Sequence, residues 1–172
     1  MIVAHLPAGF LLTTALGGRT RAQLAVGLAG SMAPDLDLLY FYTIDNCQHL
    51  HHSYWSHIPV FWLGLTVLVT IAYLGARQPL FLRPVLWLFL PNVFLHLLLD
   101  SVAGGIRWLY PVSQKSYCLF SVPSRCSHWL MNFLGHWTFL LEAAIVLFAM
   151  LVWIILYRSS RRRKQNPNEA GS

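Results

Sequence analysis

The chain has 172 residues, of which 56% are hydrophobic and only 10% are charged. A soluble domain carries roughly 25% charged residues, so this composition excludes an ordinary soluble protein and indicates an integral membrane protein. The formal net charge is +6, but four of the twelve Lys and Arg residues form the run Arg161–Lys164. The excess of positive charge therefore lies mainly near the C-terminus and does not indicate a basic binding face. We expect no nucleic-acid partner.

Apolar segments recur along the chain and predict an all-α, polytopic membrane helix bundle with about five membrane segments. The second segment is expected to break at Pro34, because proline has no N–H to donate within a helix. Residues 1–157 would form one membrane-embedded domain, and residues 158–172 a basic, disordered cytoplasmic tail. The predicted segments cover residues 2–16, 22–42, 57–76, 84–106 and 137–157.

Positive charges predict how these segments cross the membrane. Arg19 and Arg21 follow the first segment. Arg77 and Arg83 follow the third, and Arg161–Lys164 follows the fifth. Because basic loops stay on the cytoplasmic side, we expect the C-terminus inside and the N-terminus outside. This threading brings every polar residue considered below to one depth, near the outer face.

The first two segments carry a histidine and two carboxylates. His5 alone would more often be a packed polar residue than a ligand. Asp35 falls in the first turn of the helical half that Pro34 begins, where it would either cap that helix or bind a metal. Asp37 points elsewhere on a regular helix, so it could be a ligand, a support for a ligand or a residue of the rim.

Four histidines lie between residues 49 and 57, just before the third segment. Neutral imidazole is a common ligand of zinc. His52 and His57 are five residues apart, which does not place them on one helix face, so they would converge only through a turn or at the start of a helix. The alternative is an interfacial loop anchored by its aromatic residues, and this interpretation suits His49 and His51.

His96 and Asp100 stand four residues apart within the fourth segment and therefore share one helix face. A charge in hydrocarbon costs at least about 2.5–3.5 kcal/mol on insertion scales, so such a pair indicates a metal site or a proton relay. The alternative is an internal ion pair or a hydrogen bond between helices. Glu142, in the fifth segment, would orient a ligand histidine or pair with Arg107 or Arg125.

Together these residues resemble the YdjM-like family of inner-membrane proteins, which are described as metal-dependent hydrolases. The resemblance implies that the protein lies in the bacterial inner (plasma) membrane. The resemblance covers about residues 1–112, and it departs after His52, where Ser53-Tyr54 stands in place of the family's usual Arg-Gly pair. A more distant likeness joins the chain to zinc-dependent phospholipase C. The matching pieces, in chain order, are His5, Pro34-Asp35-x-Asp37, His52 with Ser56-His57, His96-x3-Asp100 and Gly105–Pro111.

The residues and the resemblance predict a membrane-bound metal-dependent hydrolase, with zinc favoured by the mixture of imidazole and carboxylate ligands. A bound ion would lower the pKa of a water from about 15.7 toward about 7. The depth of the site suggests a lipid or another phosphoester as substrate, whose phosphate Arg107 would bind. Asp37 and Glu142 are expected to assist catalysis. The expected metal ligands are His5, Asp35, His52, His57, His96 and Asp100.

Two alternatives from other functional classes use the same residues. A proton relay or small transporter would depend on a proton gradient and need no metal, and a broken second helix suits it. A structural membrane protein would use the polar residues only to hold its helices together, so single alanine substitutions would change its stability and no activity.

Overall fold

The computed structural model describes residues 3–46, 48, 51–76, 80, 82–123 and 129–165. These residues form helices and helical turns joined by loops, with no β-strand among them. The elements in chain order are α1 (His5–Ala15), α2 (Arg21–Met32), η1 (Pro34–Leu36), α3 (Asp37–Thr43), η2 (His51–Ser53), η3 (Trp55–His57), α4 (Pro59–Gly75), η5 (Val85–Phe89), α5 (Leu90–Ala103), α6 (Trp129–Leu134) and α7 (Thr138–Gln165).

Two continuous helices among the described residues are long and apolar enough to cross a membrane, Val85–Ala103 and Thr138–Arg162. A third crossing is added if α2 and the helical stretch Pro34–Thr43 count as one bent span, since they meet at 60°. The break falls at Pro34, as the sequence predicts, and Pro34 begins η1. The apolar helix α4 has 17 residues, and α1 has only 11. Helix length therefore does not confirm the expected count of about five membrane segments.

The membrane helix that carries His96 and Asp100 begins with a π-helical turn, η5. Pro91 explains this π-helical turn, because proline has no N–H to donate to the regular pattern of helical hydrogen bonds. The N–H of Leu90 donates to the carbonyl of Val85, five residues back, and the helix then continues as α5. Such π turns are frequent at functional sites.

Helices α1, α2 and α5 pack tightly because small residues lie where their backbones meet. A Cβ atom added to Gly30 of α2 would overlap the carbonyl oxygen of Phe89, at the end of η5. Asn92 of α5 crosses to α1, where its side-chain amide donates to Thr13 Oγ1 at 3.0 Å. The buried apolar cluster beside this contact joins α4 to α5 and to the loop after it, and consists of Trp62, Leu90, Val93, Leu97 and Ile106.

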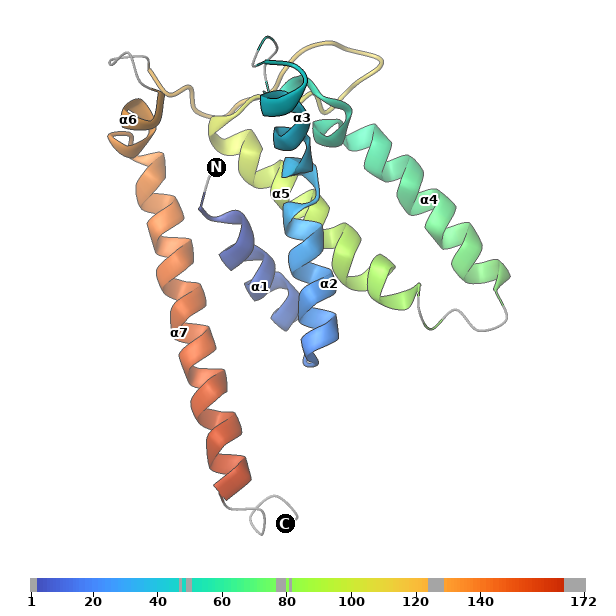
Figure 1. The fold of residues 1–172 in the computed structure, drawn as a ribbon, viewed down its shortest axis with the longest axis vertical. Helices are drawn as coiled ribbons and strands as arrows, with labels where there is room; N and C mark the ends of the chain where they lie inside the picture. The colour runs from blue at the N-terminus through green and yellow to red at the C-terminus, as the bar shows by residue number, and fades with distance from the viewer. Residues whose placement is uncertain are drawn as a thin grey trace.

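The chain termini and the connecting turns lie at two opposite ends of the molecule (Figure 1). The start of α1, α3, and the loop after α5 lie at one end. The turn between α1 and α2, the end of α4 and the end of α7 lie at the other. The loop is tied back onto α5, since Leu119 N–H donates to the Ser101 carbonyl and Trp108 Nε1 donates to Ser101 Oγ at 2.7 Å.

Helix α7 runs along one side of the bundle and contacts α1. It continues to Gln165, so it includes the first half of the segment that the sequence predicts as a disordered tail, residues 158–165. Residues 166–172 of that predicted tail lie outside the described residues.

Replacing Gly30 by alanine tests the close approach of α2 to η5. We expect Gly30→Ala to lower the free energy of unfolding by about 1–3 kcal/mol, because the new methyl group would force the backbones apart. Gly64→Ala is the matched control, since Gly64 lies inside α4 with no neighbouring atom near the added methyl group. That variant should gain up to about 1 kcal/mol from helix propensity. Thermal unfolding in detergent measures both, and equal midpoints would contradict the packing described here.

Candidate metal centre

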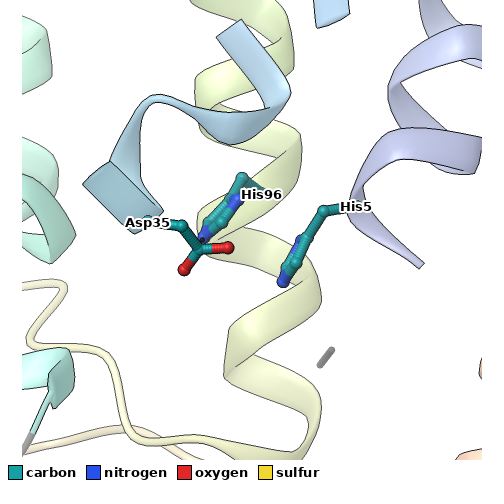
Figure 2. A group of neighbouring side chains, drawn as sticks. All are labelled: His5, Asp35 and His96. Carbon is teal, nitrogen blue, oxygen red and sulfur yellow. Dashed lines mark ion pairs between the residues drawn. The ribbon is translucent and has the colours of Figure 1, made fainter. Parts of the chain in front are cut away.

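The interruptions of regular helix bring the predicted histidines and aspartates to one place. His5 begins α1, and Asp35 lies in the turn η1 that interrupts the second segment. Figure 2 shows the side chains of His5, Asp35 and His96 converging from α1, η1 and α5. The turns η2 and η3 supply two further histidines. The residues that the structure brings together are His5, Asp35, Asp37, His52, His57, His96 and Asp100.

His96 is fully buried and is oriented by the backbone of α2. Its Nδ1 lies 2.7 Å from the carbonyl oxygen of Ser31, so Nδ1 is the protonated nitrogen and donates this hydrogen bond. Its Nε2 lies 3.0 Å from Asp100 Oδ2 and 3.6 Å from Asp35 Oδ1. Nε2 itself makes no hydrogen bond to the described part of the chain. The ring therefore turns its second nitrogen toward two carboxylates.

His57 repeats this arrangement from the other side of the centre. Its Nδ1 lies 2.8 Å from Asp37 Oδ2, a carboxylate that also accepts a hydrogen bond from Ser56 Oγ. Its Nε2 lies 3.5 Å from Asp100 Oδ2 and 3.7 Å from Asp35 Oδ1. Asp37 thus sits behind His57 and fixes the orientation of its ring.

Asp100 is the carboxylate on which the centre converges. It is 1% exposed, and besides His57 and His96 it approaches two further imidazoles. His5 Nε2 lies 3.1 Å from Asp100 Oδ1, and the His5 ring is stacked on His96 with 3.8 Å between centroids. His52 Nε2 lies 3.7 Å from Asp100 Oδ2. Four imidazoles therefore surround one buried carboxylate.

The ligand atoms fall into two groups of three, each of which could hold a metal ion. One group consists of His5, Asp35 and His96, and the other of His52, His57 and Asp100. Within each group the ligand atoms lie within 4.8 Å of one another. Imidazole nitrogen and carboxylate oxygen are ligands that suit zinc and related divalent ions, so the donor set fits a metal.

The electrostatics of His57 reflect its carboxylate neighbours. Burial by itself lowers the pKa of this imidazole, but hydrogen bonds with Asp100, Asp35 and Asp37 outweigh burial and raise the pKa to about 10. A positive charge at this position is therefore strongly stabilised. Because a metal ion binds only the deprotonated nitrogen, a proton and a metal ion would compete for Nε2 of this imidazole.

Two predicted residues make contacts with other parts of the chain. Glu142 belongs to neither group of ligands found in the described part of the chain, and its Oε2 instead accepts a hydrogen bond of 2.7 Å from the Val3 N–H. Arg107 is half-buried in the loop after α5, where its carbonyl accepts from the Tyr110 N–H. The Arg125 side chain, the alternative partner of Glu142, lies outside the described residues.

Two supports of the histidines were not predicted from the sequence. The Ser31 carbonyl that orients His96 is a backbone group, so residue type carries no signal for it. Ser56 could have been noticed as the neighbour of His57, but its bond to Asp37 depends on how η3 packs against the start of α3. His49, which the sequence assigns to an interfacial loop, lies outside the described residues.

Comparison with known proteins identifies one family. The family model described as YdjM inner membrane protein matches residues 1–166. No curated protein and no solved structure matches the chain, and the likeness to zinc-dependent phospholipase C is not shown. The family description and the apolar helices agree in placing the chain in the inner membrane.

Asp37→Asn tests the orientation of His57. The substitution keeps the size of the side chain but removes the charge that supports the imidazole, and loss of such a partner typically weakens metal binding by about 10–100-fold. We expect the affinity for Zn²⁺ to fall by this factor, as measured by competition with a chromophoric chelator in detergent. Unchanged affinity in a folded variant would contradict the supporting role of Asp37.

Proposed function

The chain belongs to the YdjM inner membrane protein family, and from that premise we propose that it is a membrane-bound metal-dependent hydrolase acting on a lipid-linked phosphoester. One observation carries the proposal. His57 and His96 each have Nδ1 bound as a hydrogen-bond donor, and each turns Nε2 toward the same two carboxylates, Asp35 and Asp100.

This arrangement calls for a cation at the centre. A neutral imidazole protonated at Nδ1 presents only a lone pair at Nε2. In His96 that nitrogen lies 3.0 Å from a carboxylate oxygen of Asp100, so two acceptors would repel each other without a positive charge between them. Buried charges in proteins are generally paired or bind metals. A divalent ion satisfies the nitrogens and the carboxylates at once.

We assign two ions to the centre, with zinc favoured by the ligands. His5, Asp35 and His96 would hold one ion, and His52, His57 and Asp100 the other. Asp100 approaches imidazoles of both groups, so its charge would help to hold either ion. When bound, such a pair supplies Lewis acidity and an activated water, the chemistry that phosphoester hydrolysis requires.

The exposure of the ligand side chains indicates the side from which substrate would approach. His5, His57 and His96 are buried, whereas the side chains of His52 and Asp35 are 28% and 19% exposed. Substrate would therefore approach past His52 and Asp35. Asp37 and Ser56 hold the ring of His57, and we assign them no contact with substrate.

An apolar groove supports a substrate with a lipid chain. The groove has a volume of about 360 Å³ and lies between α1, α2 and α7. It begins at Leu6, the residue after His5, and its α7 wall runs from Val146 to Trp153 within a stretch long enough to cross the membrane. At that depth of the membrane, lipid hydrocarbon chains surround the protein. Arg107, in the loop at the His5 end of the bundle, would bind the phosphate.

The positions of the basic residues support an outward-facing centre. The turn between α1 and α2 and the end of α7 lie at one end of the molecule, whereas the start of α1 lies at the opposite end (Figure 1). Arg19 belongs to that turn, Arg83 lies just before the helix that η5 begins, and Arg158 and Arg161 belong to the last part of α7. The positive-inside rule then puts the C-terminus in the cytoplasm and the centre near the outer face. In this arrangement α1 and α4 act as short membrane segments, which gives five in total.

A second candidate function rests on the four imidazoles that approach Asp100. Protons on these imidazoles would supply the positive charge that a metal would otherwise bring. The cluster would then be a proton relay, or an ion-pair network that holds α1, α5 and the two histidine turns together. Metal content separates this candidate from the hydrolase.

We expect about two divalent ions per chain in protein purified in detergent and resupplied with Zn²⁺, measured by mass spectrometry. His96→Ala should lose one ion and weaken the other, and Asp100→Asn should lose both, because Asp100 approaches all four imidazoles. His136→Ala is the matched control, since His136 contacts Thr138 and belongs to neither group of ligands. A folded wild-type protein without bound ions would favour the relay or structural function.

Filling the apolar groove should separate lipid from water-soluble substrates. Ala149 is 6% exposed and lines the groove, so Ala149→Trp would block it. We expect this variant to lose at least tenfold in hydrolysis of phosphatidic acid in mixed micelles and to keep its activity toward p-nitrophenyl phosphate. Leu147→Trp, at a position 66% exposed on the same helix, should change neither rate. Equal losses on both substrates would contradict a lipid site in the groove.

A further inference from the structure

Glu142 is a buried carboxylate in a helix that otherwise faces mostly outward. Only 11% of the most apolar 18-residue stretch of α7 is buried, yet Glu142 is 0% exposed. The neighbouring Leu140 and Leu141 are 70% and 39% exposed. A carboxylate inside a membrane helix is costly and rare, and it usually serves a function. Neither group of metal ligands includes it.

Glu142 contacts the segment that leads into the metal centre. Its Oε2 accepts a hydrogen bond of 2.7 Å from the Val3 N–H, two residues before His5. Helix α1 begins at His5, and its N-cap residue Ala4 provides no side-chain cap. Val3 precedes the helix by two residues, so Glu142 holds the chain that enters α1 and does not cap one of its helical N–H groups. Its carboxylate also lies near the positive end of the helix dipole, where negative charge is favourable.

The start of α1 must be fixed if His5 is to act as a ligand. The His5 ring is stacked on His96 at an interplanar angle of 14°, and its Nε2 lies 3.1 Å from Asp100 Oδ1. Both contacts depend on where the first turn of α1 lies. Because His5 is the first residue of that turn, any movement of Val3 and Ala4 is transmitted directly to it.

We propose that Glu142 is a positioning residue of the metal centre, which holds His5 in place by fixing the Val3 backbone at the start of α1. The inference rests on the proposed function and adds to it a role for α7. Only one of the two groups of ligands contains His5. Loss of the Glu142 contact should therefore weaken the ion bound by His5, Asp35 and His96, and spare the ion bound by the other group.

The test measures Zn²⁺ stoichiometry and affinity in the full chain in detergent, with no activity assay. We expect Glu142→Ala to lower the affinity for one ion about 10–100-fold, as loss of a supporting partner typically does. The other ion should remain. His5→Ala identifies the affected ion by losing the same one. Glu142→Gln should largely restore binding, because its amide oxygen can accept from the same N–H. Leu141→Ala, which removes an outward-facing side chain of the same helix, should bind like the wild type.

Val3→Pro removes the donor and leaves Glu142 in place, so it tests the contact from the other side. We expect it to weaken the same ion, and the double variant with Glu142→Ala to be no weaker than either single one, as for two residues that act through one contact. Wild-type affinity for both ions in Glu142→Ala and Val3→Pro would overturn the inference and leave the proposed function intact. Absence of ions from folded wild-type protein would instead contradict the proposed function.

Discussion

The structure depends on one buried carboxylate, Asp100, and on the imidazoles around it. A carboxylate at 1% exposure inside a membrane helix is costly unless positive charge compensates it. The four histidines that approach Asp100 come from α1, α5 and two separate turns, so compensation of this charge links distant parts of the sequence. Whatever cation the cluster holds, proton or metal, its removal would leave these elements repelling one another.

The irregular parts of the fold serve this centre. Pro34 ends α2 and begins the turn that carries Asp35, and the α3 that follows supplies Asp37 as the partner of His57. The π turn before α5 accommodates Pro91, upstream of His96. Regular spanning helices, in contrast, hold few polar side chains and expose apolar ones, as most of α7 does. Short helices and irregular turns therefore occur where the polar side chains converge on Asp100.

Spacing and breaks in the sequence predict part of this arrangement. The four-residue separation of His96 and Asp100 requires one helix face, and Pro34 requires a break, and both are found. The convergence of His52 with His57 through turns could be expected only as one option, because turn geometry depends on packing. The Ser31 carbonyl and the contact of Glu142 with Val3 could not be predicted, since both join residues far apart through tertiary packing. The number of membrane crossings is not settled by apolar length, because α1 is only 11 residues long.

X-ray absorption at the zinc edge of the zinc-loaded protein tests the central claim most directly, because it reports the atoms around the ion. The account predicts nitrogen and oxygen ligands only, at about 2.0–2.2 Å, with the scattering pattern of imidazole. It also predicts a second zinc at about 3.5–4 Å. Sulfur ligands at about 2.3 Å, or zinc surrounded by oxygen without imidazole, would contradict it.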